Sequence, residues 1–299
     1  GYGDGWRAVF YYFVSEEQAG QKGMMGGVVH EGKGGDFLGD DSFFVDGLCF
    51  EPQSAEKTVL SDVGFSLEKG HFYGILGANG SGKTSLLRHL LRILPSKKTI
   101  CFGGRFLEEY RQRELAGLLS YVPQNTVPEA DFTAEELVMM GRTPYIGRFG
   151  SPGKEDREVV QEAMRLTNCL GFADRSILCL SGGELQRVVT ARAIAQGAEW
   201  IFLDEPVSHL DSRHQMELMG VMGVLAAKKA ATVVAVLHDV NLALHYCDEL
   251  LLMKEGKLFA SGSTVDVGNA EMFGAVYDMG FEEAVAASGQ RYLMPVPQR

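Results

Sequence analysis

Residues 77–84 have the sequence Gly-Ala-Asn-Gly-Ser-Gly-Lys-Thr, which matches the phosphate-binding pattern G-x-x-x-x-G-K-[ST], the P-loop. The apolar run 72–76 precedes it and predicts a buried strand, and residues 85–91 predict a helix. This order supports the motif, because the glycines let backbone N–H groups turn toward a polyphosphate and the helix start adds a favourable field. The residues expected to contact the polyphosphate are Gly77, Ala78, Asn79, Gly80, Ser81, Gly82, Lys83, Thr84 and Ser85.

Two side chains at the end of this motif have distinct expected roles. Lys83 is expected to reach the β- and γ-phosphates, and the Thr84 hydroxyl is expected to bind Mg²⁺. A metal held in this way needs a carboxylate from another strand. The apolar run 200–203 supplies it, because the run ends in Asp204 and Glu205. Asp204 is expected to hold the metal, and Glu205 to polarise a water that attacks the γ-phosphate.

The composition is that of an ordinary globular protein. The chain has 299 residues, which predicts about two domains, and 45% of them are hydrophobic. The net charge of −11 disfavours a nucleic-acid partner, which usually needs a basic surface. No apolar run reaches the roughly 18–20 residues that span a bilayer, so a role at a membrane would need a separate partner. The five cysteines form no C-x-x-C pair, so neither a zinc site nor a disulfide framework is expected.

Strands and helices alternate along most of the chain from residue 43 onward. The expected strands are 43–45, 58–60 with 63–67, 72–76, 99–102, 118–122, 200–203, 232–237, and a hairpin of 250–253 and 257–259. The expected helices are 85–94, 133–140, 156–167, 185–195, 213–227 and 240–246. This alternation predicts an α/β fold with a mostly parallel sheet covered on both sides. The mostly helical stretch of about 125–180 interrupts it and is expected to be an inserted subdomain.

Both ends are expected to lie outside the main domain of residues 43–263. Residues 1–42 are rich in glycine and are expected to form a flexible extension. The alternative is that their one apolar cluster, Trp6–Val14, docks on a partner or on the domain itself. Residues 264–299 are expected to form short helices and a tail that contains Pro295 and Pro297.

A second glycine-containing motif, Leu180-Ser181-Gly182-Gly183-Glu184, precedes the expected helix 185–195. Ser181 is placed to cap that helix, and the paired glycines leave backbone N–H groups free for an anion. The residues alone leave two interpretations open, an anion-binding helix start and an ordinary capped helix.

Together these motifs resemble the ATP-binding-cassette (ABC) ATPases, over roughly residues 43–260. In that resemblance residues 180–184 match the signature motif, and residues 208–211 match the D-loop. Gln124 matches the Q-loop glutamine, and His238 matches the switch histidine that contacts the γ-phosphate. The implied fold is the P-loop NTPase fold of ABC ATPases, with a mostly parallel sheet core, an antiparallel β part and an inserted α-helical subdomain.

The resemblance also implies the roles of individual residues. ATP and Mg²⁺ are the implied cofactors, with catalytic residues Glu205, His238 and Lys83 and metal ligands Thr84, Gln124 and Asp204. Two cassettes pair head to tail in this family, so Ser181, Gly182 and Gly183 are expected to act on the ATP of a second copy. Family members usually stack the adenine on an aromatic residue after the first strand. Phe50 is the nearest aromatic here, and it is either that residue or a core residue.

Residues 136–145 and 236–248 resemble a narrower group, the cassettes of iron-siderophore, haem and cobalamin importers. This implies an ATPase at the cytoplasmic face of the cell membrane, bound peripherally to permease subunits that work with a substrate-binding protein. A groove beside Gln124 and residues 133–148 is expected to receive a permease helix. Charge reversal of Arg142 or enlargement of Gly141 is then expected to uncouple transport and leave basal hydrolysis.

The sequence also bears on other functions of such a cassette. The main alternative is another transporter type, either an exporter motor or an importer of other small solutes. DNA-repair cassettes need a long coiled coil between the P-loop and residue 180, and translation factors need a second P-loop; neither is present. A module that binds ATP without hydrolysis is disfavoured, because all five expected residues of the hydrolytic set are present: Lys83, Gln124, Asp204, Glu205 and His238.

Overall fold

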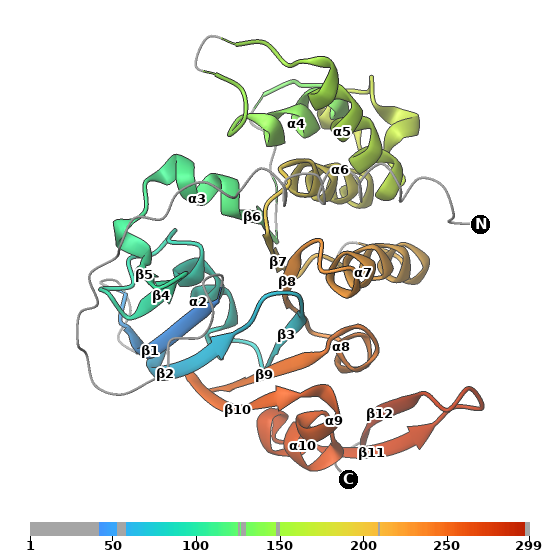
Figure 1. Ribbon diagram of the computed structural model, residues 1–299. Coiled ribbons are helices and arrows are strands. Elements are labelled where there is room, and N and C mark those ends of the chain that lie inside the picture. Colours follow the sequence, from blue (N-terminus) through green and yellow to red (C-terminus); the bar gives the residue numbers. More distant parts are fainter. Residues whose placement is uncertain are drawn as a thin grey trace.

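The computed structural model describes residues 42–52, 58–124, 126, 130–147, 150–208 and 210–296. Its centre is a six-stranded sheet in the order β10-β9-β3-β8-β7-β6 (Figure 1). Only β10 pairs antiparallel, so the expected mostly parallel sheet is confirmed. The bounds are β3 (Phe72–Leu76), β6 (Leu119–Val122), β7 (Trp200–Asp204), β8 (Thr232–Val236), β9 (Glu249–Lys254) and β10 (Lys257–Ser263).

A second, antiparallel sheet has the order β2-β1-β4-β5 and confirms the expected antiparallel part. Its strands are β1 (Phe43–Phe50), β2 (Leu60–Leu67), β4 (Ile100–Phe102) and β5 (Arg105–Phe106). Strand β1 runs to Phe50 instead of ending at Val45, because it continues past a register shift in its pairing with β2. Thr58 and Val59 were expected in β2, and they precede it.

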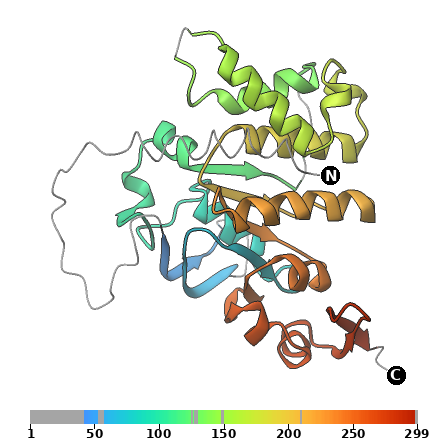
Figure 2. The ribbon, with the colours of Figure 1, turned by 45° about the vertical axis from the view of Figure 1, so that its right-hand side comes forward.

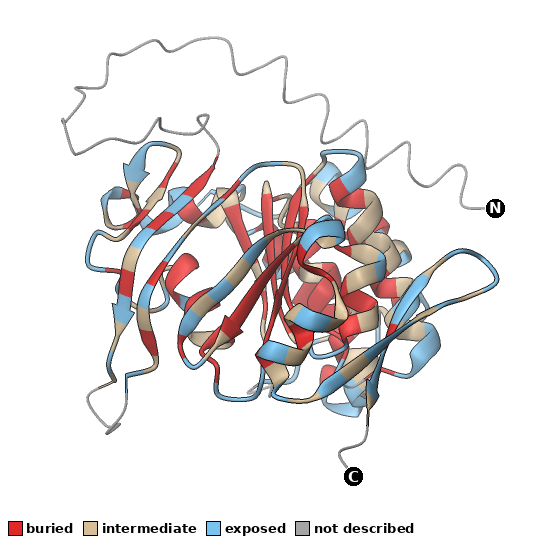
Figure 3. Ribbon diagram, turned by 90° about the horizontal axis from the view of Figure 1, so that it is seen from below, coloured by how far each residue is buried: buried red, intermediate tan, exposed pale blue. Residues whose placement is uncertain are grey.

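The central sheet is buried on both faces, which explains its continuous apolar runs. Strand β3 shows this directly. Phe72 and Leu76 belong to a core with α6 (Gly182–Ala195), α7 (Ser212–Ala227) and α8 (Val240–Tyr246). Tyr73 and Ile75 belong to a second core with α2 (Lys83–Leu90) and the antiparallel sheet. Figure 3 shows the central strands as the most continuously buried part of the chain.

A helical region connects β6 to β7 and lies beyond one edge of the sheet (Figures 1 and 2). It consists of α4 (Ala134–Met139), α5 (Lys154–Leu166) and three short 3₁₀ helices, η3 (Met140–Arg142), η4 (Leu170–Phe172) and η5 (Ile177–Cys179). Thr133 caps α4, since its hydroxyl accepts from Glu136 N and the Glu136 carboxylate accepts from Thr133 N. Helices α4 and α5 pack on α6, which carries this region against the sheet.

The end of the chain differs from the expected short helices and tail. After α9 (Thr264–Val267) and α10 (Ala270–Tyr277), a hairpin of β11 (Gly280–Val285) and β12 (Arg291–Val296) follows. The expected short helices are therefore present, and the stretch expected to be a tail contains a hairpin that was not predicted. Pro295 lies within β12, which is tolerated because this two-stranded ribbon consists only of edge strands.

Two helices differ from the prediction. Helix α3 (Gln112–Leu118) was missed, because only Leu115 of its residues is buried and it therefore has no apolar stripe. Helix α2 begins at Lys83 and ends at Leu90, two residues before the expected start and four before the expected end. The prediction for residues 1–42 falls outside the described residues, apart from Ser42.

Candidate nucleotide site

The loop 77–82 between β3 and α2 has a backbone that only glycine adopts easily. Gly77 has φ +151°, and a Cβ there would lie 2.1 Å from the carbonyl oxygen of Met253. Gly82, the residue before α2, has φ +98°, and its Cβ would lie 2.7 Å from the side chain of Leu60. These two glycines therefore let the loop lie directly against β9 and β2.

The loop leaves donors available for an anion, which is the test of whether a polyphosphate fits. No side chain caps α2, and its first turn has no acidic residue. Within the described residues, the hydroxyl of Ser81 is buried without a hydrogen-bond partner. Lys83 is 5% exposed, and its Nζ donates to the carbonyl oxygens of Gly77 at 2.8 Å and Ala78 at 3.0 Å. Burial lowers the pKa of Lys83, and the nearby Glu205 and Asp204 partly offset that effect.

An oxygen pair beside the loop suits a hard divalent cation. The Thr84 hydroxyl donates to Oδ1 of Asp204 at 3.0 Å, and Asp204 is fully buried at the end of β7. Burial raises the pKa of Asp204, and the neighbouring charge of Glu205 adds to this. The described residues contain no group of three or more His, Cys, Asp or Glu side chains that could hold a metal. Mg²⁺ would therefore take its remaining ligands from phosphate and water, as it commonly does.

Glu205 is held by residues from the ends of two other strands. Its carboxylate accepts from Gln124 Nε2 at 2.6 Å, and its Oε1 lies 2.5 Å from His238 Nε2. Gln124 follows β6, Glu205 follows β7 and His238 follows β8, so the parallel register brings all three to one edge. Glu205 has φ +50°, an unfavourable backbone conformation for a non-glycine residue that is found preferentially at functional sites. Gln124, predicted as a metal ligand, contacts Glu205 instead of Thr84 or Asp204.

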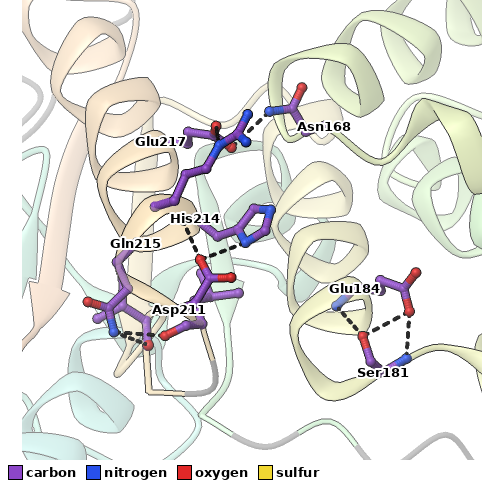
Figure 4. Close-up of polar contacts among 10 residues, drawn as sticks. Asn168, Ser181, Glu184, Asp211, His214, Gln215 and Glu217 are labelled. Atoms are coloured by element: carbon purple, nitrogen blue, oxygen red, sulfur yellow. Dashed lines mark hydrogen bonds and ion pairs between the residues drawn. The ribbon is translucent and has the colours of Figure 1, made fainter.

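Ser181 caps α6, which begins with Gly182 and Gly183. Figure 4 shows the side chains of Ser181 and Glu184 at this helix start. The Ser181 hydroxyl accepts from Glu184 N at 3.3 Å, and the Glu184 carboxylate accepts from Ser181 N at 2.8 Å. The predicted cap is therefore present. Among the described residues, no hydrogen bond or ion pair joins Ser181, Gly182 or Gly183 to residues 77–85 or to Glu205. Within one chain, the structure does not bring these two predicted halves of the site together.

Comparison with known proteins agrees with this arrangement. Residues 60–208 match the family described as ABC transporter. The chain is 36% identical to the ferric enterobactin transport ATP-binding protein FepC of Escherichia coli K12, over 74% of this chain and 82% of FepC. The chain belongs to the ABC transporter family. It is an ATP-binding cassette of the ATPase type.

Two further relatives are similar to the cassette over most of its length. It is 36% identical to the cobalamin import ATP-binding protein BtuD of Halobacterium salinarum, over 82% of this chain and 62% of BtuD. It is 39% identical to YvrA, an uncharacterized ABC transporter ATP-binding protein of Bacillus subtilis, over 75% of this chain but only 51% of YvrA. It therefore spans about half the length of YvrA.

Both solved structures share the fold of the cassette over most of its length. One is an ABC transporter described as of the metal-chelate type, in an inward-facing conformation. Its TM-score is 0.73 at 27% identity, over 86% of this chain and 98% of that chain. The other is the dimeric cassette MJ0796 bound to ADP and Pi, with a TM-score of 0.66 at 25% identity, over 74% of this chain and 98% of that chain.

The D-loop of the cassette leads into α7. Asp211 caps that helix, because its Oδ1 accepts from His214 N at 2.9 Å and lies 2.8 Å from His214 Nδ1. Gln215 donates to the carbonyl oxygens of Val207 and Leu210, which holds the loop against the helix (Figure 4). His209 lies outside the described residues.

Two tyrosines at the site of the cassette were not found from the sequence. The Tyr121 hydroxyl donates to Oδ2 of Asp204 at 3.3 Å, and the Tyr277 hydroxyl accepts from Gly77 N at 3.2 Å. Tyr121 is the second-last residue of β6 and lies three residues before Gln124, so its place in the parallel sheet was the available signal. Tyr277 lies 200 residues after Gly77, and no motif connects them. Phe50 packs edge-on against His89, with ring centroids 4.8 Å apart, in the core behind α2.

The coupling test expected for Gly141 and Arg142 needs correction, because both residues are part of the packing. The guanidinium of Arg142 is 3% exposed, pairs with Asp156 at 3.0 Å and donates to Ala195 O at 2.9 Å. A Cβ on Gly141 would lie 2.4 Å from Arg192 O. Changes at either position would therefore disturb the contact of η3 with α6 as well as any partner contact.

Proposed function

We propose that the cassette is the ATP-hydrolysing subunit of an ABC importer that powers uptake of a metal chelate through a separate membrane permease. The chelate is of the iron-siderophore, haem or cobalamin type. The contacts of Glu205 are the main support for hydrolysis. Its carboxylate lies 2.6 Å from Gln124 Nε2 and 2.5 Å from His238 Nε2, and Asp204 of the Thr84–Asp204 pair is the residue before it in the sequence. The names of FepC and BtuD and the metal-chelate type transporter support the import of a chelate.

Each residue of the site has a separate proposed role in hydrolysis. Thr84 and Asp204 would hold a bound Mg²⁺, which would neutralise part of the phosphate charge. Lys83 Nζ exchanges the carbonyl oxygens of Gly77 and Ala78 for phosphate oxygens, while the N–H groups at the start of α2 face the same anion. A carboxylate oxygen of Glu205 accepts the proton of the attacking water, and Gln124 and His238 hold that carboxylate in position.

The proposed assembly contains two cassettes. One Lys83 and one Mg²⁺ do not neutralise a triphosphate. Among the described residues, no hydrogen bond or ion pair joins the start of α6 to the P-loop of its own chain. A second copy, paired head to tail, brings Ser181, Gly182 and Gly183 to the nucleotide and supplies the missing donors. The dimeric MJ0796 structure supports this pairing.

The remaining proposed partners are integral-membrane permease subunits and a substrate-binding protein, with the cassettes bound peripherally at the cytoplasmic face. Within the described residues, no helix is both long and apolar enough to cross a bilayer. A groove of about 350 Å³ lies between α3, η3, α6 and the segment that follows α2, and it is the proposed seat of a permease helix. Its lining includes Met140 and Gly141 from the expected region but does not include Gln124. Ile93 and Met140 line it and are 54% and 40% exposed, so they can change without loss of a buried contact.

The test uses the complex that purifies through a tag on the cassette, reconstituted in liposomes with ATP and Mg²⁺ inside or outside. We expect ATP-driven transport of a ferric siderophore, haem or cobalamin toward the side of the cassette. Glu205→Gln should abolish it, and Ile93→Glu or Met140→Glu should weaken it while basal ATP hydrolysis persists. Transport away from the cassette, or of solutes that are not metal chelates, would overturn the proposal.

A further inference from the structure

Residues 264–296, here the C-terminal module, contact the P-loop directly. The module comprises α9, α10, β11 and β12 and lies beyond the part of the chain that matches the family, residues 60–208. At the end of α10, the hydroxyl of Tyr277 accepts a hydrogen bond from Gly77 N at 3.2 Å. Gly77 is also the residue whose carbonyl oxygen accepts from Lys83 Nζ at 2.8 Å. Gly77 therefore contacts Tyr277 through its N–H group and Lys83 through its carbonyl oxygen.

The position of Tyr277 is fixed on both sides. Its ring stacks on Phe273 with centroids 6.1 Å apart and meets Phe281 of β11 edge-on at 6.1 Å. Lys254, at the end of β9, donates to Ala275 O and to Asp278 Oδ1, both at 2.6 Å. The carbonyl oxygen of Met253, the residue before Lys254, lies against Gly77. The end of β9 therefore supports both the P-loop and α10, the helix that carries Tyr277.

The module has a second attachment, near the switch histidine. Asn241, in the first turn of α8, pairs with the backbone of Leu293 in β12. Asn241 Nδ2 donates to Leu293 O at 3.1 Å, and Leu293 N donates to Asn241 Oδ1 at 2.8 Å. Leu293 is 2% exposed, and both hydrogen bonds of this pair are partly buried. Asn241 is three residues after His238, and Asp239 between them caps α8 through Asn241 N and Leu242 N.

We propose that the C-terminal module positions two parts of the catalytic site, the P-loop through Tyr277 and the switch histidine through Asn241. This rests on the proposed ATP hydrolysis. Neither side chain touches the reacting atoms, so both are positioning residues. Loss of the Tyr277 hydroxyl frees Gly77 N and loosens the loop that holds the phosphates, which weakens ATP binding. Loss of the Asn241 amide loosens the start of α8, and with it the hold of His238 on Glu205, which slows turnover.

The test separates binding from turnover. In Tyr277→Phe we expect the Kd for a fluorescent ATP analogue and the KM for ATP to rise about threefold to tenfold, with kcat within about twofold, as for one hydrogen bond. Tyr292→Phe is the matched control, because Tyr292 is an exposed tyrosine of the same C-terminal module, in β12, and it should leave both constants unchanged. In Asn241→Ala we expect kcat to fall at least about threefold with the Kd unchanged, and Asn241→Asp, which keeps the acceptor for Leu293 N, should recover part of it.

Thermal unfolding distinguishes positioning from a general loss of stability. An unchanged Kd in Tyr277→Phe would overturn the proposal, and so would parallel changes of Kd and kcat in both variants that follow the change in Tm. The analogue Kd does not depend on hydrolysis. If the unmodified cassette binds the analogue but does not turn over ATP, the proposed function fails while the role of Tyr277 is still decided by binding.

Discussion

The hydroxyl of Thr84 donates to Oδ1 of Asp204 across 120 residues of sequence, at 3.0 Å. Thr84 belongs to the first turn of α2, and Asp204 is the last residue of β7. This bond joins the two halves of the chain that the helical region separates, and it places a hydroxyl and a buried carboxylate where Mg²⁺ is expected.

Asp204→Asn keeps the shape of this pair and removes the charge. We expect Mg²⁺-dependent hydrolysis to fall about a hundredfold or more, because the metal loses its charged protein ligand. Binding of ATP in EDTA should change little. The measurements are ATP turnover against Mg²⁺ concentration and nucleotide affinity without metal. Thr84→Ser, which keeps a hydroxyl, is the matched control, and hydrolysis by Asp204→Asn at the normal Mg²⁺ optimum would contradict the assignment.

Glu205→Gln should leave ATP binding and dimerisation intact and nearly abolish hydrolysis, since only the proton acceptor is removed. His238→Ala and Gln124→Ala remove one contact to Glu205 each and should lower kcat by about tenfold to a hundredfold. Turnover under saturating ATP and size-exclusion chromatography with ATP provide the measurements. Near-normal turnover in Glu205→Gln would remove this residue from the mechanism.

Mixed dimers test whether the start of α6 acts on the partner's ATP. If it does, Lys83→Ala on one chain and Ser181→Arg on the other leave one intact site and measurable hydrolysis. Both changes on the same chain, paired with an unmodified chain, leave no intact site. Differently tagged chains purified in sequence would provide the two dimers for an ATPase assay. The opposite ranking of the two dimers would show that Ser181 serves its own chain.

Gly141→Ala should destabilise the helical region. The new Cβ would lie 2.4 Å from Arg192 O, and such overpacking costs about 1–3 kcal/mol. We expect Tm to fall by roughly 2–4 °C for each kcal/mol. Gly117→Ala is the matched control, because nothing lies within 4 Å of a Cβ there and alanine favours the helix α3. An unchanged Tm in Gly141→Ala would contradict the packing of η3 on α6.

His89 gives stability a dependence on pH. It is fully buried in α2, and burial lowers its pKa from the ordinary value of 6.5. The unfolded chain then binds this proton more readily, so the stability is fully present above about pH 6.5 and falls as the pH drops below it. Urea unfolding at pH 7.5 and 5.5 should show less pH dependence in His89→Leu than in the unmodified protein. An equal dependence in the two proteins would exclude His89 as its source.

The sequence predicted those parts of the site that local patterns encode. The P-loop, the Asp204–Glu205 strand end and the Ser181 cap each depend on residues close together in the chain, and the structure has each in the expected local form. Contacts between distant segments were harder to predict. Gln124 was assigned to the metal, and its contact with Glu205 depends on the register of β6, β7 and β8, which no local pattern reveals.

The C-terminal hairpin shows why the rest could not be predicted. Strand β11 contains two adjacent glutamates, Glu282 and Glu283, and in β12 only Leu293 is buried. Neither strand therefore has the alternation of apolar and polar residues that marks a half-buried strand. Its place is set by the packing of Phe281 on Phe273 of the neighbouring α10 and by the pairing of Asn241 with Leu293, a contact between residues 52 positions apart.

The position of β3 in the sheet also governs when the nucleotide site can form during synthesis. Both strands that flank β3 come from the last third of the chain, since Val233 of β8 pairs with Phe72 and Leu250 of β9 pairs with Gly74. The ribosome synthesises the P-loop well before β8 and β9. The loop therefore leaves the exit tunnel before the two strands that flank β3. The P-loop is therefore synthesised before the strands that support it, and the nucleotide site is complete only after β8 and β9 have emerged.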